Sequence, residues 1–551
     1  MSIDISALLS GVETPSVATG VLQGGIEKPA ETYLLRRLSN PNRTVIEATW
    51  GQAVLTDNAR TVCLTGRSGS GGAFLERTLV QLDRYSSDTF SRTRPSTGWG
   101  LSEGGTGTWN HTGGSDPANY SVTPGFGQIY VDTALVTRHA FLGSYNWTSQ
   151  KMMVLVKSSR TSVASGGLSY GLVMCRVDNN NHYRLHIRVG TTGSVYARIT
   201  LNNAGTISQL TEVQLVGLVA TDSIWIKGEV SSSGVIDMYA WKDGQTPPVS
   251  PTVTTTNTSF STDGGRMGLF ASHNSAEGTT PATYSFSNFT AEGTVVNPTT
   301  VVTRSRVYML PSPHDPNGPI DLPWLAVRAK SSAPEDMYDI FMQFMPGAAA
   351  QFDEHGVKVR GDSHYGPLGS DPATFDGSRI EGSDFNDYMG VDWDYGSGGI
   401  DTNEESQLGA LDCSGFVRMV YGPMGLGLGL LHSSVTVGDG VNLTKVSYSQ
   451  MATTSLGVEL IPNVPDTTPS PTDIANLQPG DVVGFDADSG EATSGQIDHV
   501  GIYIGLSTEG DPLFVSSRKT PDGPSFSKTG GASSLSGSGL YATRFRVARR
   551  F

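Results

Sequence analysis

Two residues far apart in the last third of the chain could together act as a nucleophile and its base. Cys413 lies in residues 411–421 (LDCSGFVRMVY), and His499 lies in residues 498–505 (DHVGIYIG). A cysteine thiolate attacks carbonyl carbons, and a histidine can take the thiol proton and later return it to a leaving group. If the fold brings the two together, the pair predicts hydrolysis of an amide or ester through a thiol.

The segment around Cys413 predicts a helix that begins at this residue. The apolar residues Phe416, Val417, Val420 and Tyr421 follow it at helical spacing, which is typical of a buried helix face. The free backbone N–H groups and the dipole at a helix start stabilise a thiolate. We therefore expect the helix start to activate Cys413.

The segment around His499 predicts a strand. Val500, Ile502 and Ile504 alternate with the face that carries His499. A third segment, residues 477–485 (LQPGDVVGF), has a Pro-Gly-Asp turn followed by a short apolar run. We expect this run to pair with the His499 strand in an antiparallel sheet.

In this order, the three segments resemble the NlpC/p60 cysteine peptidase family. The family signatures are Asp-Cys-Ser-Gly on a helix, a Pro-Gly-Asp turn and His-Val-Gly-Ile-Tyr on a strand, and residues 412–415, 479–481 and 499–503 match them. The resemblance extends over residues 336–551 and implies a papain-like α+β domain. It implies that Cys413 attacks an amide in the stem peptide of bacterial peptidoglycan, often beside D-glutamate, with His499 as the base. No cofactor is implied, and no His, Asp or Glu cluster has the spacing of a zinc site.

The resemblance also implies an oxyanion tyrosine upstream of the nucleophile. Tyr395, in residues 395–399 (YGSGG), has the form of that motif, and Tyr388 is the alternative. The backbone N–H of Cys413 would complete the oxyanion hole. Asp412 and Ser414 flank the nucleophile, where capping of the helix is the expected role. Ser414 is also a candidate for oxyanion or substrate binding.

The sequence departs from the family at the third polar residue, which orients the imidazole. The family has His, Asn or Gln on the strand after the histidine strand, whereas residues 513–518 (LFVSSR) place Ser516 in that position. Ser517 or a water molecule could serve instead. A serine orients an imidazole less firmly than an amide or a second imidazole, so a weakened or specialised enzyme is one possible consequence.

The rest of the chain predicts a multidomain protein that is rich in β-structure. We expect an arm over residues 1–30, a small β-module over 31–85, a β-sandwich over 86–295, a proline-rich extended linker over 296–335 and the peptidase domain over 336–551. The order of aromatic and glycine residues in the sandwich resembles a laminin-G or concanavalin-like jelly roll. On these boundaries, a chain that lacks residues 1–300 should remain soluble and active.

Composition narrows the choice of partners. The 551-residue chain carries a net charge of -15, which argues against general nucleic-acid binding and against electrostatic attachment to an anionic membrane. No apolar stretch reaches the ~18–20 residues of a membrane span.

The three cysteines imply no disulfide framework, and Cys63 and Cys175 are expected to be small buried residues. The N-terminus lacks the basic start and apolar run of a secretory signal, so we expect another route of delivery.

Three hypotheses for the whole chain follow from these features. The first is a peptidoglycan hydrolase carried on a phage tail and localised to the virion, with a related contractile injection particle as the alternative carrier. Its partners would be other tail proteins, and a homo-oligomer is a possible assembly. The second is a structural or receptor-binding and glycan-binding tail protein whose peptidase fold is weak or inactive. The third is an amidase or acyltransferase on the same fold, because pocket shape rather than the catalytic pair selects the bond.

Overall fold

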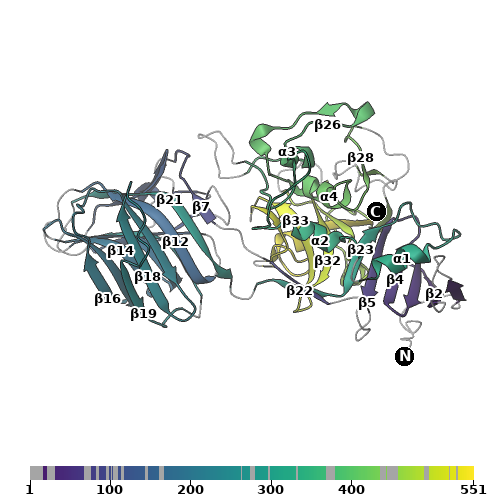
Figure 1. Ribbon diagram of the computed structural model, residues 1–551, viewed down its shortest axis with the longest axis horizontal. Coiled ribbons are helices and arrows are strands. Elements are labelled where there is room, and N and C mark those ends of the chain that lie inside the picture. Colours follow the sequence, from purple (N-terminus) through teal and green to yellow (C-terminus); the bar gives the residue numbers. More distant parts are fainter. Residues whose placement is uncertain are drawn as a thin grey trace.

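The computed structural model of the protein describes residues 16–20, 31–66, 76–81, 86–94, 98–100, 102, 109–112, 117–133, 135–142, 147–160, 167–190, 192–261, 264–273, 280–295, 298–330, 333–367, 379–434, 442–443, 457–488, 495–519, 522–528 and 531–551. Figure 1 shows a β-sandwich on one side of the molecule. The other side holds both the N-terminal strands and the C-terminal domain. Among the described residues, no helix has both the length and the apolar character to cross a membrane.

The predicted sandwich over residues 86–295 is confirmed as two antiparallel sheets that share one buried core. Its strands are β7 (Ser86–Asp88), β8 (Trp109–Thr112), β9 (Tyr120–Thr123), β10 (Phe126–Val131), β11 (Thr137–Leu142), β12 (Trp147–Ser158), β13 (Leu168–Asp178), β14 (Asn181–Val189), β15 (Val195–Asn203), β16 (Thr206–Gln214), β17 (Ile224–Val230), β18 (Val235–Lys242), β19 (Val253–Thr256), β20 (Arg266–His273) and β21 (Ala282–Val295). One sheet has the order β19-β18-β17-β12-β21-β10-β9, with β7 also paired to β21, and the other has the order β16-β15-β14-β13-β20-β11-β8. Alternation explains the two layers: on β17, Ile224, Ile226, Gly228 and Val230 are buried, while the residue between each of them and the next is partly exposed.

The N-terminal strands form a separate six-stranded antiparallel sheet. Its order is β1-β2-β3-β4-β5-β23, made of β1 (Ser16–Gly20), β2 (Glu31–Leu38), β3 (Arg43–Ala48), β4 (Gly51–Thr56), β5 (Thr61–Gly66) and β23 (Ser305–Met309). Strand β1 belongs to the segment predicted as an arm, most of which lies outside the described residues. The last strand comes from a part of the chain about 240 residues away from its neighbour β5.

The prediction of an extended linker over residues 296–335 is wrong. Strand β22 (Thr300–Thr303) pairs with β6 (Arg77–Val80), β23 pairs with β5, and helix α1 (Leu322–Arg328) buries Leu325 against the N-terminal sheet. Most of the prolines occupy the loop after β23 and the first turn of α1, where a missing N–H is tolerated, and Pro298 and Pro334 lie just before β22 and just before α2. The alternating run VVTRSRVYM is what forms the strands. The sandwich is therefore an insertion between β6 and β22, which lie side by side.

The C-terminal domain surrounds a six-stranded sheet of order β30-β35-β31-β32-β33-β34. The strands are β30 (Val458–Ile461), β31 (Val482–Phe485), β32 (His499–Leu506), β33 (Pro512–Arg518), β34 (Gly523–Ser525) and β35 (Phe545–Arg550). The helices are α2 (Met337–Met342), α3 (Phe385–Met389), α4 (Cys413–Tyr421), α6 (Pro471–Ala475) and α7 (Leu540–Arg544). The predicted antiparallel pairing of β31 with β32 is confirmed, with Val482 opposite Ile502.

The N-terminal sheet and the C-terminal domain share a hydrophobic core. Cys63, Leu79, Val301 and Val307 are buried in the same cluster of side chains as helix α4. Removing these residues would uncover apolar surface that stabilises the domain. Side chains of β5, β6, β22 and β23 therefore form one core together with those of the C-terminal domain.

Polar contacts join the same two parts. Arg550 on β35 forms a buried ion pair with Asp481 at 2.7 Å and donates to the hydroxyl of Thr56 at 2.7 Å. The backbone N–H groups of Arg60 and Thr61 donate to the carbonyl of Phe551, the last residue, at 2.8 and 2.6 Å. These contacts argue against the expectation that residues 1–300 can be removed without harm to the peptidase domain.

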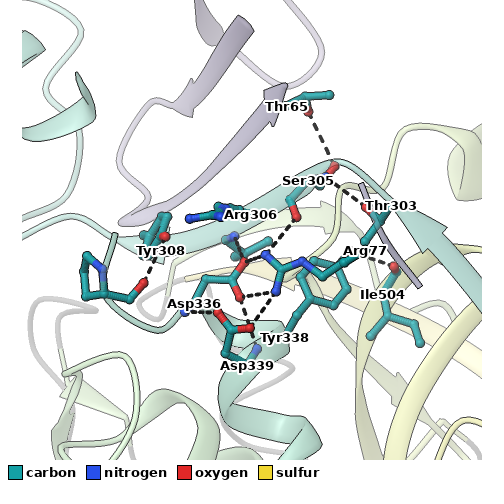
Figure 2. Close-up of polar contacts among 12 residues, drawn as sticks. Thr65, Arg77, Thr303, Ser305, Arg306, Tyr308, Asp336, Tyr338, Asp339 and Ile504 are labelled. Atoms are coloured by element: carbon teal, nitrogen blue, oxygen red, sulfur yellow. Dashed lines mark hydrogen bonds and ion pairs between the residues drawn. The ribbon is translucent and has the colours of Figure 1, made fainter. Parts of the chain in front are cut away.

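Figure 2 shows a further contact, in which Arg77 on β6 binds the start of α2. Its guanidinium donates to both carboxylate oxygens of Asp336, at 2.9 and 2.8 Å, and to Asp339 at 2.9 Å. Asp336 is fully buried, caps α2 and also accepts from the backbone N–H of Val307 at 3.1 Å. The carboxylate thus links three segments that are distant in sequence.

We expect Arg77→Met to lower the free energy of unfolding by about 3–5 kcal/mol, because it leaves the buried Asp336 carboxylate without its cation. Urea denaturation of the full chain measures the loss. The control is Arg304→Ala, which breaks the exposed neighbouring pair with Glu76 and should cost about 1 kcal/mol or less. Equal losses in the two variants would contradict the prediction.

Candidate active site

Helix α4 begins at the predicted nucleophile. The carboxylate of Asp412 accepts a hydrogen bond from the backbone N–H of Gly415 at 2.8 Å and caps the helix. Phe416 and Val417 are fully buried in the core. Cys413 therefore lies in the first turn, held between the cap and the buried face, and 9% of it is exposed.

Ser414 contributes to the same helix start. Its hydroxyl donates to the carboxylate of Asp412 at 2.9 Å, and the side chain is buried. These contacts fit the expected capping role of both residues. A role for Ser414 in oxyanion or substrate binding stays a prediction, because its hydroxyl proton is already donated to Asp412.

Strand β32 begins at the predicted base. Helix α4 packs against β32, and the backbone N–H of Val500 is close enough to the sulfur of Cys413 to lower the pKa of the thiol. Val500 directly follows His499 along the strand. The sulfur consequently lies beside the first residues of β32, where His499 stands with 8% of its surface exposed.

The third predicted residue, Ser516 on β33, contacts the imidazole directly. Its Oγ lies 2.7 Å from Nε2 of His499 and donates to the backbone carbonyl of Val500 at 2.6 Å. A hydroxyl that has donated its proton accepts the hydrogen bond from the ring, so Nε2 carries the proton and Nδ1 can accept one. Ser517, the alternative, instead donates to the backbone carbonyl of Leu411.

Burial affects the proton affinity of the nucleophile. It raises the pKa of the Cys413 thiol well above its ordinary value, and the carboxylates of Asp412 and Glu381 add to the rise, while hydrogen bonds from backbone N–H groups oppose it. The sequence predicts that the helix start favours a thiolate. In the free protein, desolvation of the charged form outweighs that effect.

The pKa of the predicted base, His499, shifts downward, in the opposite direction from that of the thiol. Burial, together with the positive charges of Arg518 and Lys519, lowers the pKa of His499 to about 3. At neutral pH the resting pair is thus a thiol beside a neutral imidazole. Proton transfer would accompany attack on the substrate rather than precede it.

A cavity of about 390 Å³ opens next to His499. Tyr365 and Tyr541 line it, and its wall also holds Glu381 and Lys519, which form an ion pair at 2.7 Å. The cavity therefore offers aromatic surface together with both signs of charge. Such a lining suits a polar peptide better than a lipid or another apolar ligand.

The structure does not bring Tyr395 to this cavity. Its hydroxyl accepts a hydrogen bond from the guanidinium of Arg418 at 2.6 Å, and its ring lies against His432. Arg418 is on α4 but also binds Asp384 at 2.6 Å. The alternative, Tyr388, donates its hydroxyl to the carbonyl of Gly361 at 2.7 Å. Neither tyrosine is among the residues that line the cavity, so the oxyanion role of Tyr395 stays a prediction.

Tyr365 is the tyrosine that lines the cavity, and the sequence did not single it out. Burial raises the pKa of its hydroxyl, and the neighbouring charges of Cys413 and Asp412 raise it further, so the hydroxyl stays a proton donor. The backbone N–H of Tyr365 donates to Asp522 at 2.8 Å, and Nδ1 of His364 lies 2.5 Å from the same carboxylate. A single tyrosine in a loop has no local motif by which it could have been found.

The described part of the chain contains no group of three or more His, Cys, Asp or Glu residues that could hold a metal ion. Cys63 and Cys175 are free and buried, in line with the interpretation of both as small core residues.

We expect Ser516→Ala to lower kcat/KM on a soluble stem peptide by roughly tenfold to a hundredfold, because the imidazole loses the hydrogen bond that sets its tautomer. Ser525→Ala is the matched control, since Ser525 is buried on β34 opposite Ser516 and does not contact His499. Steady-state kinetics of both variants measure the difference. Unchanged kcat/KM in Ser516→Ala would remove this residue from the site.

Comparisons with known proteins bear on this region. A family model described as the NlpC/P60 family matches residues 390–521, so the C-terminal part of the chain contains an NlpC/P60 domain. The match covers the helix with Cys413, the strand with His499 and the strand with Ser516. It supports a hydrolase or peptidase role connected with peptidoglycan. No curated protein matches the chain.

Several solved structures resemble the chain at low identity. The exoplasmic/lumenal domain of VIP36 in its Ca2+/Man3GlcNAc-bound form is 11% identical, with 34% of this chain and 85% of that chain covered and a TM-score of 0.26. Xylan beta-1,4-xylosidase from Bacillus halodurans C-125 is 13% identical, with 53% and 66% covered and a TM-score of 0.28. The GH43 BlXynB protein from Bacillus licheniformis is 14% identical, with 51% and 64% covered and a TM-score of 0.29. Similarities this low do not indicate a ligand or an activity for this chain.

Proposed function

We propose that the NlpC/P60 domain is a thiol hydrolase that cleaves an amide bond in the stem peptide of bacterial peptidoglycan. The observation that supports this most directly is the position of Cys413 beside the strand that begins at His499, together with the contact of His499 with Ser516 next to a cavity. The thiol lies next to the strand that carries the base, and the base has a hydroxyl partner that sets its tautomer. Nucleophile, base and orienting group are the parts that acyl transfer through a thiol requires.

In the first half of the reaction, the sulfur of Cys413 attacks the carbonyl carbon of the amide while its proton moves to Nδ1 of His499. The positive imidazole is stabilised because its Nε2–H already donates to Ser516, which in turn donates to a backbone carbonyl. Nδ1–H then protonates the nitrogen of the leaving amine as the C–N bond breaks. A thioester on Cys413 and a free amine are the products of this half.

Charge builds up on the carbonyl oxygen during the attack. In this proposal, the hydroxyl of Tyr365, which lines the cavity, and the backbone N–H of Cys413 donate to that oxyanion. In the second half, His499 takes a proton from water, the resulting hydroxide attacks the thioester, and the proton returns to the leaving sulfur. Cys413 is regenerated and the new carboxylate departs.

The test is digestion of purified sacculi from several bacterial wall types, with the released fragments identified by mass spectrometry. The Cys413→Ala protein is the comparator. New amine ends from the wild-type protein alone would establish a thiol hydrolase and identify its bond. Transfer of the acyl group to an added amine would favour the acyltransferase alternative, and no release by either protein would favour a structural or receptor-binding role.

We further propose that a phage tail delivers the enzyme to the wall. The separate sandwich, inserted between β6 and β22, supports this because it offers a binding surface away from the cavity. Mass spectrometry of purified virions tests the idea. A chain found only in infected cells and never in particles would argue against tail carriage and against tail proteins as partners.

A further inference from the structure

Tyr541 lies against the imidazole of His499 from a part of the chain that the family model does not cover. It belongs to α7, beyond residues 390–521. The two ring centres are 4.8 Å apart with an angle of 37° between the ring planes. Tyr541 also lines the cavity beside His499. The ring thus forms one wall of the space in which the base would act.

Tyr541 is itself held by aromatic and cationic neighbours. Its ring meets Phe485 edge to face at 5.1 Å and Phe514 edge to face at 5.5 Å. The guanidinium of Arg518 lies 5.3 Å from the centre of the same ring. Edge-to-face pairs and cation–π contacts favour one orientation of a ring over others. The tyrosine is therefore a fixed surface for the imidazole.

We propose that Tyr541 is a positioning residue for His499: its ring sets the plane of the imidazole and excludes bulk water from one of its faces. The hydrogen bond to Ser516 fixes Nε2 but not the plane of the imidazole, and the ring of Phe485 lies farther away, at 5.9 Å between ring centres. The closer contact with Tyr541 restricts rotation of the imidazole and determines where Nδ1 points. This inference rests on the proposed thiol mechanism and adds a residue outside the family signatures.

The titratable and charged groups around His499 are Cys413 on α4, Tyr365 and Glu381 before α3, Asp488 and Asp498 before β32, Arg518 at the end of β33, Lys519 directly after it, and Tyr541 on α7. Of these, Tyr541 covers the imidazole with apolar surface. Removing its ring admits water and weakens the desolvation that keeps the pKa of His499 low. The base works as the neutral imidazole, so activity is lost as pH falls through that pKa. A raised pKa therefore moves the loss of activity to higher pH.

The first experiment is an NMR pH titration of the full chain with 15N-labelled histidine. The His499→Gln protein identifies the His499 signal. We expect Tyr541→Leu to raise the pKa of His499 by roughly one unit or more, and Tyr541→Phe to leave it nearly unchanged. The control is Phe545→Leu. This substitution removes a ring that contacts Phe485 and so belongs to the same aromatic cluster. An unchanged His499 pKa in Tyr541→Leu, or the same rise in Phe545→Leu, would overturn the inference.

The second experiment measures the pH dependence of kcat/KM for the same variants. We expect Tyr541→Leu to lower kcat/KM by roughly tenfold at neutral pH and to shift its acid limb upward, with Tyr541→Phe close to wild type. A loss of activity in Tyr541→Leu with an unshifted profile would mean a purely structural role. The NMR result does not need activity, so a failure of the proposed function and a failure of this inference can be told apart.

Discussion

Cys413→Ala is expected to lower the rate of fragment release from cell walls by ~10³-fold or more, to the level of a blank. The sulfur lies in the first turn of α4 beside the strand that begins at His499, so no other group of the site can replace it as the nucleophile. His499→Ala should cause a loss of similar size. Because the two residues act as a unit, the double variant should lose little more than either single one.

The control for this prediction is Cys175→Ala, which removes a buried thiol in the sandwich. It should leave the rate within about threefold of wild type, since small buried cysteines contribute mainly packing. Circular dichroism and thermal unfolding would establish that all variants are folded. Substantial hydrolysis by a folded Cys413→Ala protein would refute the thiol mechanism.

Deletion of residues 1–300 is expected to unfold the peptidase domain, whereas excision of the sandwich should leave it active. The deletion removes β5 and β6, so β23 and β22 lose their partners and the buried Asp336 loses Arg77. Leaving that carboxylate unpaired costs about 3–5 kcal/mol, and the exposed core adds to it. The sum is comparable with the ~5–15 kcal/mol that stabilises a typical domain.

The matched variant replaces residues 82–297 by a short glycine–serine turn. The backbone N–H of Gln81 donates to the carbonyl of Thr299 at 2.9 Å, so the two ends already lie side by side. This protein should unfold cooperatively and should cleave a soluble stem peptide with kcat/KM within about threefold of the full chain. A stable, active protein after deletion of residues 1–300 would contradict the shared core.

The pair of Cys413 and His499 could be identified from sequence because each sits in an element with a clear periodicity. A stripe of apolar residues at helical spacing places Cys413 at a helix start, and strict alternation places His499 at a strand start. Ser516 could be assigned by its position on the next strand, although only the structure shows that its hydroxyl lies 2.7 Å from the imidazole.

Tyrosines were harder to assign than the catalytic pair. Tyr395 has the form of the family motif, yet its hydroxyl binds Arg418. Tyr365 and Tyr541, which do line the cavity, come from a loop and a short helix. Neither segment has a periodicity that indicates which way a side chain points, so their placement depends on contacts with distant residues.

For many segments, including the helix at Cys413 and the strand at His499, the sequence by itself determined helix or strand, because that choice depends on the local spacing of apolar residues. Only the tertiary structure decided that residues 300–309 return to pair with β5 and β6 and that Arg77 neutralises Asp336. Pairing between segments more than 200 residues apart depends on the fit of whole surfaces. An alternating run such as VVTRSRVYM specifies a strand but not its partner, which is why a proline-rich segment could be mistaken for a linker.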